Sequence, residues 1–432
     1  MVRLSRNTLK RYGNRQFMDG WNLSIIRRSL FLLALVVPGL LLNFGLSVVV
    51  AEYFSAQVFG LFYLGMSVAA VIAAPSAVIA FYLARYYGEC QKRFGDEAVW
   101  ALARTSFRRY GLYFIVASLI LCAIAFPMAR LADIGSPLLI GVVVILATST
   151  YLIDAVRGIL QACQRFLFLG SFGLSWMAGR FALGLGAIWV TGKVWAGLLG
   201  VSASAMLAAL AFYLFLVFRK EVSVVPDMGA AGLRLKTQVP FALGYSFAFI
   251  IAYSDIIIGY LIMDKVALGV YSASSVLPKG IYTLTMPIMQ VMFPIIVSNE
   301  GEETRRETVR RALLMTLALT VMGGLVLWVG SNQICGGWFS LGSCESGTVA
   351  LLAISIPAIS LLRGLVLMQL AKGGEMHSLL LFFPLAVFVG YELTLGPGSF
   401  GLAGDFAVFT LATLVFYALA CLFIKPVKCQ FS

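Results

Sequence analysis

Four charged residues lie deep inside apolar stretches of this 432-residue sequence, where a charge is costly unless a partner or a polar cavity supports it. Lys279 lies about 18 Å of helix into the stretch 267–297. Asp255 lies in the preceding apolar stretch, about 10 Å from its end. Arg180 and Arg363 lie inside two others. Such residues either pair or snorkel within the protein, or they line a cavity that binds a ligand.

The cations outnumber the carboxylate among these deep residues, and the surplus indicates a class of ligand. Arginine and lysine bind phosphate and carboxylate groups through charge-assisted hydrogen bonds, so we expect an anionic ligand such as a pyrophosphate headgroup. Asp255 and Lys279 are predicted to approach each other, either as a lock between two helices or as part of the ligand site. Tyr253, like Tyr245 and Tyr260 on the same stretch, either packs or faces a sugar.

The remaining charged residues of the apolar stretches suggest more ordinary roles. Asp154 and Arg157 are three residues apart, which places them on one helix face and predicts a local ion pair. Glu52, Glu392 and Asp405 lie near the ends of their stretches, where we expect their carboxylates to reach water.

Twelve apolar stretches position these residues, and each is long enough, or nearly so, to cross a bilayer as a helix of about 20 residues. Apolar residues make up 61% of the chain and charged residues 12%. The sequence therefore predicts an all-α polytopic membrane protein. The expected spans are 29–52, 60–83, 111–129, 137–156, 167–190, 195–218, 239–262, 267–297, 312–330, 348–370, 377–394 and 401–424.

Basic residues alternate between the loops. Of the 32 lysines and arginines, 26 fall in the tails and in every second loop, three in the other loops and three within the spans. Because basic loops stay on the cytoplasmic side, both termini are predicted to be cytoplasmic, in a cytoplasmic (inner) membrane. The same rule accounts for the net charge of +13, so nucleic acid is not an expected partner.

Two internal echoes suggest a parallel repeat of six-helix bundles. Phe59-Gly60-Leu61-Phe62 corresponds to Leu268-Gly269-Val270-Tyr271, and Gly197-Leu198-x-Gly200 corresponds to Gly401-Leu402-x-Gly404. Transporters built from such halves commonly place their substrate site between them. The predicted organisation is a basic tail (1–28), a first bundle (29–218), a linker (219–238), a second bundle (239–424) and a tail (425–432).

Signs of catalysis are sparse in the sequence. It contains no G-x-x-x-x-G-K-[S/T] nucleotide loop, one histidine (His377), and no His/Cys/carboxylate set with metal-ligand spacing. We therefore expect neither an enzyme nor a cofactor or metal site. Cys335 and Cys344 share the short segment after span 312–330 and are a candidate disulfide if that side of the membrane is oxidising.

The chain also resembles a known family. Ser254-Asp255-Ile256-Ile257-Ile258-Gly259, followed by Gly269-Val270-Tyr271-Ser272-Ala273-Ser274, is similar to the seventh-to-eighth helix signature of polysaccharide flippases of the multidrug/oligosaccharidyl-lipid/polysaccharide exporter superfamily. Phe59-Gly60, Gly158-Ile159-Leu160-Gln161-Ala162 and Phe293-Pro294-Ile295-Ile296 also resemble that family. The likeness covers nearly the whole chain.

This resemblance implies a central cavity lined mainly by helices one, two, seven and eight, which would favour Lys279 over Arg180 and Arg363 as a cavity residue. It further implies alternating access that moves a polyprenyl-pyrophosphate-linked glycan between leaflets. The implied partners are the lipid-linked glycan, the bilayer, polymerase and glycosyltransferase machinery, and a coupling cation (H⁺ or Na⁺). Asp255 is the candidate ion-coupling carboxylate by its position.

Two rival functions remain open. A cation-coupled small-molecule or drug antiporter, of the same superfamily or of the major-facilitator type, would also have twelve spans and parallel halves. The major-facilitator type usually carries an Asp-Arg-x-Gly-Arg-like run after its second span, whereas this chain has Ala84-Arg85-Tyr86-Tyr87-Gly88-Glu89 there. A membrane glycosyltransferase or polymerase is the other rival, although the expected acid, base or metal residues are missing.

Overall fold

Helices make up every regular element in the part of the chain that the computed structural model describes, which confirms the predicted all-α fold. The described residues are 6–131, 137–163, 165–218, 235–297, 302–338, 344–371, 379–396 and 401–423. The helices are α1 (Arg6–Tyr53), α2 (Ala56–Leu131), α3 (Pro137–Ala162), α4 (Phe166–Thr191), α5 (Val194–Phe218), α6 (Leu235–Ile262), α7 (Lys265–Leu284), α8 (Met286–Val297), α9 (Glu302–Trp338), α10 (Ser346–Ala371), α12 (Phe382–Leu395) and α13 (Gly401–Phe423).

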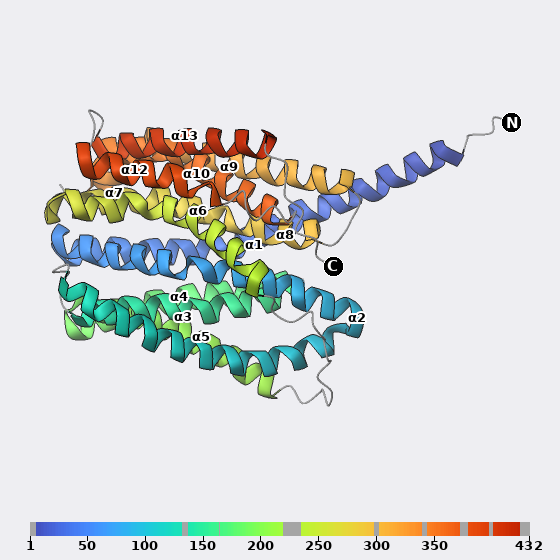
Figure 1. Ribbon diagram of the computed structural model, residues 1–432, viewed down its shortest axis with the longest axis horizontal. Coiled ribbons are helices and arrows are strands. Elements are labelled where there is room, and N and C mark those ends of the chain that lie inside the picture. Colours follow the sequence, from blue (N-terminus) through green and yellow to red (C-terminus); the bar gives the residue numbers. More distant parts are fainter. Residues whose placement is uncertain are drawn as a thin grey trace.

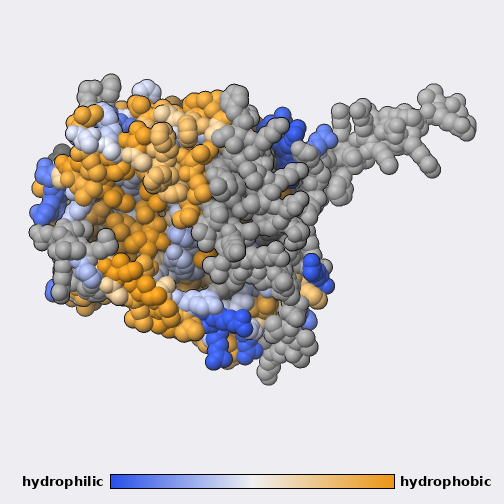
Figure 2. All heavy atoms as spheres, in the orientation of Figure 1, coloured by the Kyte–Doolittle hydropathy of each residue, from blue (hydrophilic) through white to orange (hydrophobic). Residues whose placement is uncertain are grey.

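Most of these helices have the length and composition of membrane spans. Within the described residues, ten helical segments are long and apolar enough to cross a bilayer. The two other expected spans correspond to the broken pair α7 and α8 and to the shorter α12. Apolar side chains cover most of the described surface on the face drawn in Figure 2. Helices that face lipid need such side chains, because the bilayer core is hydrocarbon. The chain is thus a multi-pass membrane protein.

The helix α2 contains two spans joined at Gly95. Its segments Ala56–Gly88 and Glu97–Ala125 are each apolar enough to cross a membrane. Gly95 has φ 83°, a value that glycine adopts far more readily than other residues. We expected a loop between spans 60–83 and 111–129, but helical structure extends to both sides of Gly95 because the intervening alanine, arginine and glutamate residues are good helix formers.

The expected span 267–297 is divided at Thr285, which separates α7 from α8. Proline lacks a backbone N–H and can break a helix, but α7 continues through Pro278 and past Lys279. The break instead precedes Pro287, which lies in the first turn of α8, where proline's missing N–H costs little.

The two halves of the sequence lie on opposite sides of the molecule. Figure 1 shows α3, α4 and α5 along one long side and α9, α10, α12 and α13 along the other. We call α1–α5 the N-terminal half and α6–α13 the C-terminal half. The first helix begins and the last helix ends at the same end of the bundle (Figure 1).

Equivalent segments of the predicted repeat meet at one end of the interface between the halves. A Cβ atom on Gly60 would lie 3.0 Å from the backbone nitrogen of Gly269, and one on Gly269 would overlap the backbone carbonyl of Ala56. Equivalent segments that touch in this way are expected of parallel repeats related by an axis along the membrane normal. We call this contact the glycine crossing.

The halves also touch at the other end of the interface. The Gln161 side chain of α3 donates a hydrogen bond of 2.7 Å to the Gln290 carbonyl oxygen of α8. Nearby, the rings of Phe81 (α2) and Phe293 (α8) lie 4.6 Å apart between centroids. The two halves are therefore in contact at both ends of their interface.

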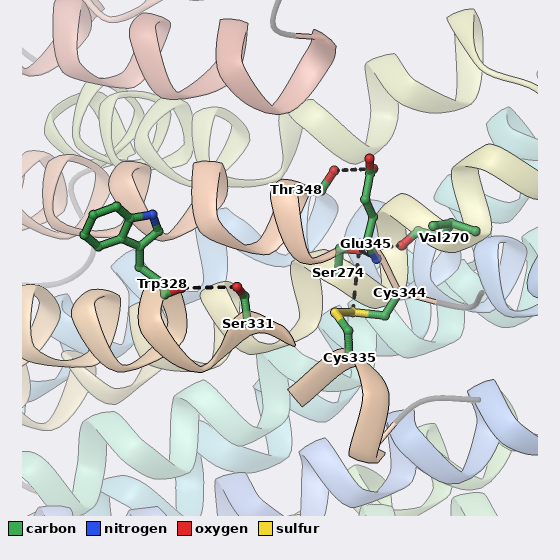
Figure 3. Close-up of a disulfide and its surroundings, with 8 residues drawn as sticks. All are labelled: Val270, Ser274, Trp328, Ser331, Cys335, Cys344, Glu345 and Thr348. Atoms are coloured by element: carbon green, nitrogen blue, oxygen red, sulfur yellow. Dashed lines mark hydrogen bonds between the residues drawn. A yellow bond between two sulfur atoms is a disulfide. The ribbon is translucent and has the colours of Figure 1, made fainter. Parts of the chain in front are cut away.

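A disulfide joins Cys335, in the last turn of α9, to Cys344, just before α10 (Figure 3). The segment also contacts α7, because the Glu345 backbone N–H donates to the Ser274 hydroxyl at 2.8 Å and the Ser274 hydroxyl lies 3.8 Å from the Cys344 sulfur. The disulfide thus fixes the α9–α10 connection against α7, the helix that also contributes Gly269 to the glycine crossing.

Removing this disulfide is expected to lower stability. Cys335→Ser and Cys344→Ser each open a loop with a sequence separation of 9 residues, and loops of that size contribute about 2–3 kcal/mol through the unfolded chain. The melting temperature of the purified protein should fall by a similar amount in either variant and in the reduced wild type. An unchanged melting temperature in all three samples would contradict this expectation.

Candidate functional site

A central cavity of about 300 Å³ lies between the two halves. The N-terminal half contributes side chains from α1 to α5, and the C-terminal half contributes side chains from α6, α7, α8 and α10. Four of the candidate site residues from the sequence line this cavity, namely Arg180, Tyr253, Lys279 and Arg363. The fifth candidate, Asp255, lies directly behind Lys279.

Asp255 and Lys279 form a buried ion pair between α6 and α7. The Lys279 ammonium lies 2.7 Å from Asp255 Oδ1, and the Tyr271 hydroxyl donates to Asp255 Oδ2 at 3.2 Å. The Lys279 ammonium also lies 5.0 Å from the centre of the Tyr253 ring. Since Asp255 is 0% exposed while Lys279 lines the cavity, the pair joins two helices and also presents a cation to the ligand space.

Arg180 stands beside an aromatic side chain of its own helix, α4. Its guanidinium carbon lies 5.2 Å from the Trp176 ring, and its nitrogens lie 3.9 Å from the sulfur atoms of Met66 and Met177. The rotation of α4 about its axis directs the Arg180 side chain into the central cavity. The resemblance pointed to other helices as the main lining of the cavity, but packing places this arginine in it.

Arg363 is the largest fully buried side chain in the described structure, with 1% of its area exposed. Its guanidinium donates to the Tyr282 carbonyl oxygen at 2.9 Å and to the Thr285 hydroxyl. These groups lie where α7 ends, and the same carbonyl oxygen also accepts from the Thr285 N–H at 3.3 Å and the Thr285 hydroxyl at 2.8 Å, so Arg363 joins the hydrogen bonds that close the end of the helix. Its guanidinium carbon also lies 4.1 Å from the Tyr282 ring.

The sequence did not assign Asp154 and Arg157 to the ligand space, yet both line the cavity. They form the predicted local pair, with 3.1 Å between Arg157 Nη1 and Asp154 Oδ1. Asp154 also accepts a hydrogen bond of 2.5 Å from Ser76 on α2, and Arg157 lies 4.8 Å from the Trp176 ring. The signal available in the sequence was a charged pair at the end of an apolar stretch, where membrane helices seldom place charges against lipid.

The cavity is positively charged overall. Four cations line it, Arg157, Arg180, Lys279 and Arg363, whereas one carboxylate, Asp154, lines it and a second, Asp255, lies behind it. Charges that are buried in protein are screened much less than those in water. The arrangement therefore suits an anionic group better than a cationic one.

Glu392 differs from the expectation for the other carboxylates near span ends. Glu52 is exposed and Asp405 is half-buried, but Glu392 is 0% exposed on α12 and neither of its carboxylate oxygens has a hydrogen-bond partner. The expectation that Glu392 reaches water was wrong, because the face of α12 that carries it packs inside the C-terminal half. His377 lies outside the described residues.

Among the described residues, no three His, Cys, Asp or Glu side chains form a group that could hold a metal ion. The chemistry of the cavity is instead that of arginine, lysine, aromatic rings and hydroxyls. Such groups bind and orient a ligand through charge, hydrogen bonds and stacking.

Comparisons by sequence find no matching family model and no matching curated protein. Comparison of the fold does find similar solved structures. One is the eukaryotic MATE transporter AtDTX14, with a TM-score of 0.68, 14% identity, and coverage of 93% of this chain and 96% of that chain. Another is the lipid II flippase MurJ in an inward closed conformation, with a TM-score of 0.66, 13% identity, and coverage of 90% and 87%.

A third similar structure is a MOP superfamily transporter from Pyrococcus furiosus, for which a reversed polarity of the binding pocket suggested a different function. Its TM-score is 0.59 at 13% identity, with coverage of 91% of this chain and 94% of that chain. At these identities the likeness concerns the fold, and these neighbours are transporters rather than enzymes. The chain therefore has the fold of MOP superfamily transporters.

Proposed function

We propose that this protein moves a polyprenyl-pyrophosphate-linked oligosaccharide across the cytoplasmic membrane for assembly of a surface polysaccharide. The observation that carries the proposal is the cationic surplus of the central cavity. A phosphate-bearing headgroup would find arginine and lysine side chains there, while aromatic residues such as Trp176 and Tyr253 offer stacking surfaces for sugars. The lipid tail would stay in the bilayer through a lateral opening.

The fold supports transport by alternating access in general. Two halves meet on both sides of a cavity to which each half contributes cations. Rocking of one half against the other around such a site exposes it to each side in turn. Asp255 is our candidate for coupling to H⁺ or Na⁺, because a cation bound there would compete with the Lys279 ammonium for the same carboxylate.

The leaflet distribution of lipid-linked glycans in spheroplasts of a deletion strain tests the proposal. We expect intermediates to accumulate in the inner leaflet and to return to the outer leaflet when the gene is restored. Lys279→Ala should fail to restore them and Lys279→Arg should restore part, at equal amounts of protein in the membrane. Full restoration by Lys279→Ala would remove Lys279 from the binding site.

A drug or small-molecule antiporter is the second candidate, because the same fold occurs in MATE transporters and the cavity has aromatic walls. If the deletion strain distributes its lipid-linked glycans normally but becomes susceptible to a panel of toxic compounds, the antiporter replaces our proposal. Synthesis of glycan product by the purified protein alone would instead favour a glycosyltransferase or polymerase.

A further inference from the structure

A second cavity, of about 200 Å³, lies in the N-terminal half between α2, α3, α4 and α5. None of the described residues that line it also lines the central cavity. We call it the aromatic groove, because its lining includes Arg165 and five aromatic residues, Trp100, Phe168, Phe172, Phe212 and Phe215. Arg165 is the charged member of the described residues that line the groove.

The aromatic groove opens to the outside of the helix bundle. Phe168 of α4 is 51% exposed and Phe215 of α5 is 45% exposed. Ser171 and Ser175 of α4, which also line the groove, are exposed as well. Both helices are long and apolar enough to cross a bilayer, and they lie along one long side of the molecule in Figure 1. Because the outer surface of such helices faces lipid, the groove is accessible to a molecule of the bilayer.

Aromatic contacts hold Arg165 at one end of the groove. Its guanidinium carbon lies 5.7 Å from the centre of the Trp100 ring and 6.0 Å from that of the Phe168 ring. The Trp100 ring is itself fixed, because it is 4% exposed and meets the Phe215 ring edge-on at 6.0 Å between centroids. Ring faces attract a cation, so these contacts position the half-buried guanidinium at the groove.

The charge at this end of the groove complements an anionic lipid headgroup. Arg165 directly precedes α4, at the end of the helix that the distribution of basic loops predicts to be cytoplasmic. Arg104 adds a second cation, because it is exposed and lies one turn from Trp100 on α2. The cytoplasmic leaflet contains anionic lipids, and basic pockets between helices at that level bind their headgroups. A guanidinium also matches the geometry of a phosphate group.

We propose that the aromatic groove binds an anionic phospholipid of the cytoplasmic leaflet, with its phosphate at Arg165 and an acyl chain between α4 and α5. The chain would lie against Phe172 and Phe212, whose rings are 6.3 Å apart between centroids. Ser171 follows Arg165 by six residues, about 9 Å along the helix, so its hydroxyl lies beside the path of the chain. The bound lipid connects α2, α4 and α5 from outside, whatever ligand the central cavity transports.

Native mass spectrometry of the purified full-length protein, titrated in detergent with phosphatidylglycerol or phosphatidylcholine of identical acyl chains, tests the proposal. Wild type should retain one phosphatidylglycerol in preference to phosphatidylcholine. Arg165→Gln should weaken phosphatidylglycerol binding by about fivefold, the effect of one basic residue on an anionic lipid, and should leave phosphatidylcholine binding unchanged. Arg165→Lys should keep most of the preference, because it keeps the charge.

Lys193→Gln is the matched control. Lys193 also lies beside an aromatic ring, 5.8 Å from the centre of Trp195, but it follows the opposite end of α4 and does not line the groove. This variant should keep the wild-type preference. Ser171→Phe tests the groove independently of Arg165: an exposed serine can be enlarged without overpacking the core, and the added ring should weaken the binding of both lipids by occupying the path of the chain.

Equal binding of the two lipids by wild type would overturn the proposal. So would wild-type affinity for phosphatidylglycerol in Arg165→Gln and Ser171→Phe, or a loss in Lys193→Gln as large as that in Arg165→Gln. Inorganic phosphate should not displace the lipid, because it has no acyl chain to occupy the groove, and displacement by it would reduce the site to one for free anions. Displacement by a polyprenyl phosphate at equal concentration would replace the phospholipid with a lipid carrier.

Discussion

Asp255→Asn is expected to destabilise the protein by about 3–5 kcal/mol, the usual cost of leaving one partner of a buried ion pair without its counter-charge. Asp255 is 0% exposed and lies 2.7 Å from the Lys279 ammonium, so asparagine would leave that ammonium in a site with little access to water. Lys279→Met should destabilise in the same way by stranding the carboxylate. Thermal unfolding of the purified protein in detergent measures both effects.

The double variant Asp255→Asn/Lys279→Met provides the decisive comparison. Because it contains neither charge, we expect it to be more stable than either single variant. Glu307→Gln is the matched control, since Glu307 forms a pair of 2.6 Å with Arg311 in which both side chains are partly exposed; such pairs contribute at most about 1 kcal/mol. A double variant less stable than both single variants would contradict a role for charge compensation.

Gly269→Ala is expected to abolish the close approach of the halves at the glycine crossing and with it most of the transport. A methyl group at position 269 would overlap the backbone carbonyl of Ala56, and backbone atoms of two helices cannot move aside as a flexible side chain can. Overpacking of this kind costs about 1–3 kcal/mol. The cost falls on conformations in which this end is closed, so the protein should shift towards conformations in which it is open.

Maleimide labelling of a cysteine at position 276 measures the shift. Val276 lines the cavity, so Val276→Cys in a background without the free cysteines should react faster when Gly269→Ala is also present. Gly186→Ala is the control, because a Cβ at Gly186 of α4 would meet nothing within 4 Å. Slower or unchanged labelling together with normal transport would show that the halves tolerate a methyl group at the crossing.

Neighbouring residues of one helix illustrate how far the sequence could predict the site. Lys279 was recognisable because a lysine so deep in an apolar stretch has few alternatives to a cavity. The position of the helix break in the same stretch could not be read from the sequence, because Pro278 and Pro287 are equally strong local signals. Pro278 is accommodated inside α7, whereas the break at Thr285 coincides with hydrogen bonds from Arg363, which is 78 residues away in sequence.

Arg157 and Glu392 show the complementary limit. Both lie near the ends of apolar stretches, and their positions along the chain suggested contact with water or with a local partner. In the structure Arg157 lines the cavity and Glu392 is fully buried. Depth along a helix can be counted from the sequence, but the direction in which a side chain points depends on how the helix is rotated against its neighbours.

The class of the protein, its apolar stretches and the identity of its deep charges could all be predicted from the amino-acid sequence. Those properties are local, since a bilayer of fixed thickness selects segments by length and hydropathy. That Arg157, Arg180, Lys279 and Arg363 share one cavity, and that Gly60 meets Gly269, became visible only from the packing of the helices. The reason is that helix rotation and tilt are set by packing against other helices, which no single segment encodes.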